Sequence, residues 1–126
     1  MAVLIKLSHN GLQGYLGIGT DQWGCLVERD RAARLTTTTD KGYLFYGTSD
    51  GWWLSVGTTG ARNGYVGFYA WANVGWPNWK YDAANKRLTS DFGNGPVSLT
   101  SLYDGFVYCW AGSGYVPAQV EMETVA

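Results

Sequence analysis

The sequence has few of the residues that most catalytic and metal sites use. Its 126 residues include one histidine, His9, and two cysteines, Cys25 and Cys109. No cysteine–histidine pattern at zinc spacing and no acidic calcium loop occurs. The ten acidic residues are scattered, and no pair suggests glycosidase chemistry. We therefore expect no metal, no cofactor and no enzymatic activity.

Charge and long apolar runs are also scarce. Lysine and arginine number nine, the net charge is −1, and basic residues form no cluster. This excludes a nucleic-acid footprint and a polybasic membrane patch. No segment is apolar enough to insert into a bilayer, and residues 1–11 lack the cleavage site of a signal peptide. We expect a cytoplasmic protein, or one exported without a signal peptide, whose cysteines are buried free thiols rather than a disulfide.

Helical periodicity is the third feature that is missing. Apolar residues never recur at helical spacing for more than about two turns, and residues 29–35 come nearest. The chain is instead rich in glycine, with 18 residues, and in aromatic residues, which make up 16%. Four consecutive threonines at 36–39 favour a strand. The composition predicts an all-β fold of many short strands, forming a single domain over residues 1–126.

The strand-like segments recur in three units, roughly 1–42, 43–86 and 87–126. Each unit contains about four strands. The third strands begin at Gly24, Gly64 and Gly105, and the fourth lie near Leu35, Trp79 and Val120. Three units without helices cannot each bury a face alone, so they must share one core. Closing the three units around an axis would also remove the exposed sheet edges.

This repeat pattern resembles the β-trefoil over the whole chain. The segment 79–95, WKYDAANKRLTSDFGNG, is similar to the ricin-B type of β-trefoil lectin. The length and the lack of disulfide spacing resemble the small cytoplasmic lectins of mushrooms. The resemblance implies three repeats around a pseudo-threefold axis and binding of galactose or N-acetylgalactosamine glycans. A blade-like or sandwich arrangement of the same strands is the alternative.

The motifs of the ricin-B-type family are only partly retained. The family's ligand aspartate on the second strand matches Gly17, Ser55 and Ser98, none of which is acidic. Its Gln-x-Trp signature remains only as residues 77–79, Pro-Asn-Trp. Its stacking aromatic at the end of the third strand matches Arg29, Tyr69 and Trp110. We therefore expect the polar partners of a sugar to come from the turns.

Aromatic residues near polar turns indicate candidate glycan sites. A sugar presents an apolar C–H face and an edge of hydroxyls, so its site needs an aromatic platform and fixed polar partners. Each unit offers such a set around its third strand. The candidate carbohydrate-binding residues are Asp21, Trp23, Arg29 and Asp30 in the first unit, Asp50, Asn63, Tyr69, Trp71, Asn73 and Trp76 in the second, and Asp104, Trp110 and Tyr115 in the third.

Strand alternation assigns some of the aromatic residues to a core instead. Trp79 aligns with Leu35 and Val120 and is expected to be buried. Two sets are expected to occupy opposite faces of the third strands: Val66, Phe68, Val107 and Cys109 inward, and Tyr65, Tyr69, Trp71 and Trp110 on the other face. The sequence leaves Trp71, Trp76 and Trp110 open between core and ligand. It also aligns Glu28 with Phe68, so either the first unit's strand ends by Val27 or the register differs there.

Two other function classes compete with a lectin that binds glycoconjugates. A β-trefoil protease inhibitor could use the loop 57–64, GTTGARNG, with Arg62 as the specificity residue. A structural or protein-interaction module is a third reading. The segment 47–51 matches G-x-S-x-G, but it precedes a strand-like run and is expected to be a turn. An exposed aromatic patch would also allow a homodimer to form.

Overall fold

The computed structural model describes residues 2–38, 43–47, 51–70 and 78–125, and within these ranges the regular structure is all-β. The strands are β1 (Ala2–His9), β2 (Leu12–Ile18), β3 (Gly24–Val27), β4 (Leu35–Thr38), β5 (Leu44–Gly47), β6 (Trp53–Val56), β7 (Val66–Tyr69), β8 (Trp79–Asp82), β9 (Arg87–Ser90), β10 (Val97–Thr100), β11 (Tyr108–Cys109), β12 (Tyr115–Pro117) and β13 (Gln119–Val125). Three short 3₁₀ turns join some of them: η1 (Thr20–Gln22), η2 (Arg29–Arg31) and η3 (Gly60–Arg62). The all-β prediction is confirmed.

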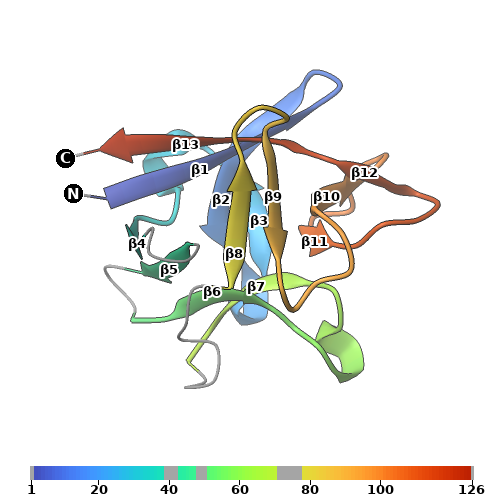
Figure 1. Cartoon of the computed structure of the whole chain (residues 1–126), viewed down its shortest axis with the longest axis horizontal. Coiled ribbons are helices and arrows are strands. Elements are labelled where there is room, and N and C mark those ends of the chain that lie inside the picture. Colours follow the sequence, from blue (N-terminus) through green and yellow to red (C-terminus); the bar gives the residue numbers. More distant parts are fainter. Residues whose placement is uncertain (1, 39–42, 48–50, 71–77, 126) are drawn as a thin grey trace.

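Six strands follow one another in hydrogen-bonded order and return to the first. β1 pairs with β4 and β13, β4 pairs with β5, and β8 pairs with β9. A bridge between Tyr43 and Trp79 joins the β5 and β8 segments. The Val120 amide donates to the Lys86 carbonyl at 2.9 Å, which joins β13 to the start of β9. Figure 1 shows β1 and β13 running side by side, with both chain ends at the same edge.

Three antiparallel hairpins extend from these six strands. They are formed by β2 with β3, β6 with β7, and β10 with β11, and β12 pairs with the other edge of β10. The hairpins also bridge to one another, because Trp23 pairs with Gly67 and Tyr65 pairs with Tyr108. The residues around the start of the third strand in each of the three units therefore meet in space.

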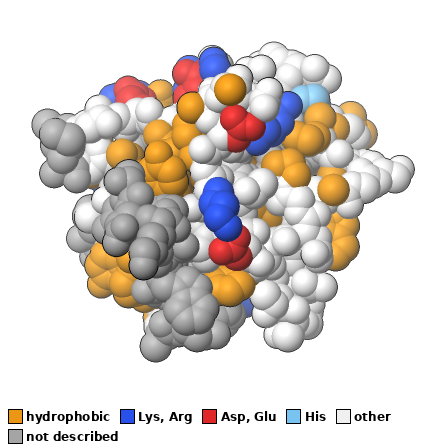
Figure 2. Space-filling model, viewed as in Figure 1, with side chains coloured by type: hydrophobic (Ala, Val, Ile, Leu, Met, Phe, Trp, Pro, Cys, Tyr) orange, Lys and Arg blue, Asp and Glu red, His pale blue; other side chains and the backbone are white. Residues whose placement is uncertain are grey.

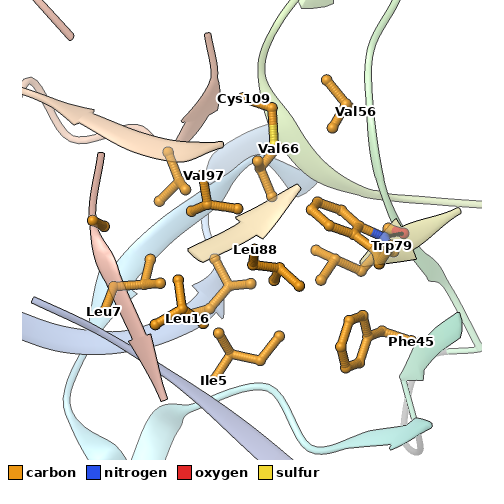
Figure 3. Close-up of a cluster of buried hydrophobic side chains, with 14 of the residues drawn as sticks. Ile5, Leu7, Leu16, Phe45, Val56, Val66, Trp79, Leu88, Val97 and Cys109 are labelled. Atoms are coloured by element: carbon orange, nitrogen blue, oxygen red, sulfur yellow. Dashed lines mark hydrogen bonds between the residues drawn. The ribbon is translucent and has the colours of Figure 1, made fainter. Parts of the chain in front are cut away.

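The core lies inside the six strands and under the hairpins. Figure 3 shows side chains from β1, β5, β8 and β9, among others, pointing toward one another. Trp79 is 0% exposed, and its indole Nε1 donates to the Leu54 carbonyl at 2.8 Å. Because the six strands and the hairpins all contribute to one cluster, they bury apolar surface that none of them could bury alone.

Several predictions about individual segments are confirmed. Trp79 is buried, and the expected inward set Val66, Phe68, Val107 and Cys109 is buried as well. Residues 36–38 of the threonine run belong to β4. The helical candidate 29–35 forms only the single turn η2 before β4 begins, since one amphipathic turn cannot nucleate a helix. Thr39, and Thr48 to Asp50 of the G-x-S-x-G segment, lie outside the described residues.

The surface mixes charges of both signs with apolar groups. Figure 2 shows one face, on which basic and acidic side chains lie next to each other among hydrophobic ones. Ion pairs between described residues include Arg29–Glu123, Lys80–Asp91 and Lys86–Glu121. Within the described ranges, no helix has the length and apolar character to cross a bilayer.

Candidate functional site

Three aromatic rings, one from each unit, meet where the hairpins converge. Trp23, Tyr65 and Phe106 follow one another at 42 and 41 residues along the chain. Their ring centroids are 4.3 Å apart for Trp23–Tyr65, 5.0 Å for Trp23–Phe106 and 5.5 Å for Tyr65–Phe106. All three side chains are half-buried. We call this set the aromatic triangle. Tilted and edge-to-face pairs at these separations stabilise the contact beyond the area they bury.

Two tyrosines of the third unit extend the aromatic triangle. Tyr108 packs on Tyr65 at 4.6 Å, and Tyr115 packs on Tyr108 at 5.1 Å. The Tyr108 hydroxyl donates to the Asp104 carboxylate, which also accepts from the Phe106 amide at 3.1 Å. Burial, and then the bond to Asp104, raises the pKa of the Tyr108 hydroxyl well above its usual range. Asp104 thus orients this end of the aromatic triangle and stays exposed.

The second unit contributes a cation to the same region. The Arg62 guanidinium lies 5.4 Å from the ring centroids of both Trp23 and Tyr69, and its Nη2 donates to the Asp21 carbonyl at 3.1 Å. Cation–π contacts of this kind contribute about 1–2 kcal/mol when they are partly desolvated. Arg62 is therefore held across the turn that carries Asp21. A protease specificity residue would have to extend from its loop into solvent, whereas here the Arg62 guanidinium packs against two aromatic rings.

Cross-strand pairing corrects the alignment of the first unit. Gly17, Ser55 and Ser98 are opposite Cys25, Gly67 and Tyr108 respectively. Two residues further along, the equivalent positions are Val27, Tyr69 and Trp110. The alignment of Gly24, Gly64 and Gly105 had matched Arg29 with Tyr69 and Trp110. Strand pairing shows that this match is wrong. The turn before β3 is shorter than that before β7, so Gly24 matches Val66, and β3 ends at Val27 before the exposed Glu28.

The remaining first-unit candidates separate from Trp23. Arg29 donates to Glu123 on β13 at 2.8 Å, and the Tyr15 hydroxyl donates to the same carboxylate at 2.8 Å. These two hydrogen bonds hold the pKa of Glu123 below its usual value, and the one from Arg29 has the larger effect. Asp30 is exposed on η2 and lines a separate hollow with Leu4 and Val125. Asp21 is exposed beside Trp23, so only these two of the four candidates stay together.

Tyr69 is the clearest correction among the second-unit candidates. It was expected on the ligand-facing side of its strand, but its side chain is only 2% exposed. Burial raises the pKa of its hydroxyl, and the nearby Arg62 opposes that rise. The ring serves as a support for Arg62 and cannot offer a platform to a ligand. All four residues of β7 are buried, so both faces of this strand are covered.

The other candidates are spread over the surface. Asn63 is exposed in the turn after η3, and Tyr115 is half-buried at the end of the aromatic row. Trp110 is half-buried and packs against Gly64. A Cβ atom on Gly64 would lie 2.7 Å from the Trp110 ring. Asp50, Trp71, Asn73 and Trp76 lie outside the described residues. Ser55 on β6 and Ser98 on β10 are 0% exposed.

A hollow beside the aromatic triangle brings Trp23 together with residues that were not predicted. It has a volume of about 280 Å³ and is lined by Gly19, Thr20, Trp23, Gly24, Cys25, Gly105 and Phe106. We call it the Trp23 hollow. Gly105 adopts φ +100°, and a Cβ there would meet no atom within 4 Å, so its wall stays open. Phe106 could have been found from the sequence, because its spacing from Tyr65 nearly equals that of Tyr65 from Trp23.

Two further hollows flank β2. One, of about 450 Å³, is mostly polar and is lined by His9, Gln13, Arg87, Gln119 and their neighbours. The other, of about 580 Å³, lies between β2, β3 and Tyr103. We call this one the Tyr103 hollow. The Tyr103 hydroxyl accepts a hydrogen bond from the Leu26 amide at 2.8 Å, which attaches the third unit to the open edge of β3.

The titratable groups of the described residues offer little for catalysis. Cys25 and Cys109 are free, and burial raises the pKa of both thiols, which disfavours the reactive thiolate. Cys109 is buried as expected, whereas Cys25 is half-exposed. No group of three metal-ligating side chains occurs within the described ranges. Comparison of the chain with protein-family models, curated proteins and solved structures gives no match.

Proposed function

We propose that this protein is a carbohydrate-binding lectin with the β-trefoil architecture, and that it binds without catalysing a reaction. The ring of six paired strands and the three hairpins are the arrangement that a β-trefoil requires. The equivalent positions of Trp23, Tyr65 and Phe106 support a pseudo-threefold relation between the units. Both proposals extend the resemblance drawn from the sequence.

The observation that carries the lectin proposal is the aromatic wall of the Trp23 hollow. Trp23 and Phe106 line it together, and their rings are half-buried. Stacking of a sugar's C–H face on such rings removes apolar surface of both partners from water. The rest of the wall consists of Cys25, Thr20 and glycine backbone, and the last two can exchange hydrogen bonds with hydroxyls. This combination of platform and polar edge suits a neutral monosaccharide better than a charged or extended apolar ligand.

Galactose or N-acetylgalactosamine is the sugar class that the family resemblance implies. The second-strand aspartate of that family has no counterpart at Gly17, Ser55 or Ser98, so its hydrogen bonds must come from elsewhere. Asp21 is exposed in the turn that also carries Thr20. In this proposal the Asp21 carboxylate accepts hydrogen bonds from the sugar's hydroxyl groups. The rings of Trp23 and Phe106 form the surface on which the sugar stacks.

The test is glycan-array screening followed by calorimetry on two matched variants. Thr20→Arg places a long side chain across the Trp23 hollow, whereas Thr58→Arg makes the same change at an exposed threonine of the second unit. Thr20→Arg is expected to weaken binding at least about tenfold, because it fills the pocket, with an unchanged melting temperature. Thr58→Arg is expected to bind as the wild type does.

Two outcomes would overturn the proposal at different levels. If the wild type binds no glycan on the array, the lectin function is wrong. If the wild type binds but Thr20→Arg binds equally well, the site lies elsewhere on the molecule. A trypsin and cysteine-protease inhibition assay belongs in the same experiment, since tight inhibition without glycan binding would favour the inhibitor class.

A further inference from the structure

The loop that joins β10 to β11 presents a leucine to solvent. Leu102 is 95% exposed, whereas the next most exposed large apolar side chains of the described residues, Leu12 and Tyr46, reach only 38% and 36%. An isolated, almost fully exposed leucine loses the stabilisation that burial of its side chain would provide. A partner that covered this side chain would gain that stabilisation.

The backbone on both sides of Leu102 is firmly held. The Tyr103 amide donates to the Thr100 carbonyl, and the Asp104 amide donates to the Thr100 hydroxyl, both at 2.9 Å. The Tyr103 ring reaches across to β3, where its hydroxyl accepts from the Leu26 amide. Leu102 is thus a knob fixed on an ordered turn, and little conformational entropy would be lost when it docks.

A matching hole lies on the same face. The Tyr103 hollow is walled by apolar parts of Leu12, Tyr15, Leu26, Val27 and Tyr103. Since Tyr103 follows Leu102 directly and lines the hollow, the knob and the hole are neighbours on one surface. Leu102 does not line this hollow, so a second molecule can supply the leucine that fills it.

The charges around the knob and the hole are complementary. The loop 100–105 carries one charged residue, Asp104, which is exposed. The rim of the hollow carries Lys6, Arg29 and Arg31 against Glu28. Arg29 is paired with Glu123, so these five groups leave the rim with one net positive charge. A twofold axis in the plane of this surface would bring the acidic loop of each copy to the basic rim of the other. A single self-complementary patch of this kind is what an isologous dimer requires.

We propose that two copies of this chain form a twofold dimer in which Leu102 of each copy inserts into the Tyr103 hollow of the other. The proposal does not depend on the lectin function. If that function holds as well, the dimer carries two Trp23 hollows and gains avidity for multivalent glycans.

Sedimentation equilibrium from micromolar to millimolar concentration tests the dimer with three variants. Leu102→Asp removes the knob and Leu12→Asp places a charge in the hole. Tyr46→Asp makes the matched change at an apolar residue of similar exposure on β5. Each of the first two variants is expected to weaken dimerisation about 100-fold or more, because two leucine contacts are lost per dimer. Tyr46→Asp is expected to dimerise as the wild type does.

A mixing experiment tests the reciprocal geometry. An equimolar mixture of Leu102→Asp and Leu12→Asp retains one intact knob-and-hole contact per heterodimer, whereas each variant alone retains none. The mixture is therefore expected to dimerise more tightly than either variant and less tightly than the wild type. Circular dichroism of each variant verifies that it is folded.

Three results would overturn the proposal. The first is a wild type that stays monomeric up to millimolar concentration, and the second is a Leu102→Asp variant that dimerises normally. The third is a mixture of Leu102→Asp and Leu12→Asp that associates no more tightly than either variant alone. That result would contradict the insertion of Leu102 into the Tyr103 hollow. If the wild type is monomeric and binds vesicles of anionic phospholipid through Leu102, the partner of the knob is a membrane and not a second copy.

Discussion

Trp79 shows how one side chain can serve both packing and hydrogen bonding. Its indole fills the centre of the core, and its Nε1 satisfies the Leu54 carbonyl of β6. The ring lies 6.2 Å from that of Phe45, so it links the β5 and β8 segments as well. A buried donor with a fixed acceptor specifies one orientation of the ring, which pure apolar packing would leave less defined.

Replacement of Trp79 by phenylalanine should be strongly destabilising. The substitution leaves a cavity and an unpaired buried carbonyl at Leu54, which together cost about 2–4 kcal/mol. Urea unfolding of Trp79→Phe is expected to show a lower midpoint with an unchanged slope. Trp53→Phe is the control, because Trp53 is half-exposed and packs on the exposed Tyr46. Equal midpoints for the two variants would contradict the assignment of Trp79 to the core.

Glu123 should make a pH-dependent contribution to stability. Its pKa in the folded state is lowered from 4.5, mainly by the hydrogen bond from Arg29 and then by that from Tyr15. A depressed folded pKa means that the stabilisation is complete above the unfolded pKa and is lost as pH falls through the folded value. The melting temperature of Glu123→Gln should thus be lower than that of the wild type at pH 7, and the difference should vanish in acid.

Carbon-detected NMR titration measures the same effect directly. The Glu123 carboxyl is expected to titrate below pH 4.5 in the wild type and to return toward that value in Arg29→Gln. The pair is more than one-third exposed on both sides, so salt should reduce the difference. If the Arg29→Gln substitution leaves the pKa of Glu123 unchanged, the ion pair does not cause the lowered pKa.

At the scale of elements, the loop before η3 depends on a close backbone contact. A Cβ on Gly57 would lie 2.1 Å from the Arg62 carbonyl oxygen, so only glycine fits there. The Gly57 amide and carbonyl also bond to Tyr65 and Gly64, at 3.1 and 2.8 Å. This contact sets the path of η3 and so places Arg62 over Trp23.

Gly57→Ala should therefore displace Arg62 and loosen the aromatic triangle. We expect a loss of about 2–3 kcal/mol, because the overlap involves backbone and cannot be relieved by a rotamer change. Gly60→Asn in the same loop is the control, since Gly60 has φ +61°, which asparagine tolerates, and its Cβ would meet nothing. Chemical denaturation with Trp fluorescence measures both variants, and similar stabilities would refute the steric argument.

The elements were largely predictable from sequence, whereas their convergence was not. The repeat placed the fourth strands at Leu35, Trp79 and Val120, and all three residues are 0% exposed. Local composition suffices there because strand residues alternate in burial. Trp23 was assigned to a separate first-unit site. The reason is that aligning the third strands on Gly24, Gly64 and Gly105 placed β3 in the wrong register relative to the other two. A turn of different length hides the equivalence of Trp23 and Tyr65, and only strand pairing reveals it.

At the scale of the whole molecule, the three units are joined by side chains that cross from one to another. Arg62 of the second unit covers Trp23 of the first, Tyr103 of the third bonds to Leu26 of the first, and Tyr81 of the second donates to the Val120 carbonyl at 2.6 Å. β1 and β13 pair over seven positions although they lie at opposite ends of the sequence. No unit therefore has a complete core or a complete set of hydrogen bonds of its own.

This interdependence predicts that the chain unfolds in one cooperative step. Leu35→Ala in the first unit should cost about 2–5 kcal/mol, as expected for a fully buried leucine. It should shift the far-ultraviolet circular dichroism and the tryptophan fluorescence transitions to the same lower urea concentration. The fluorescence includes Trp79 and Trp110 of the other two units, so a local effect would leave part of that signal at the wild-type midpoint. Two separate transitions would mean that the units are stable on their own, and the shared core would then contribute less than the contacts within each unit.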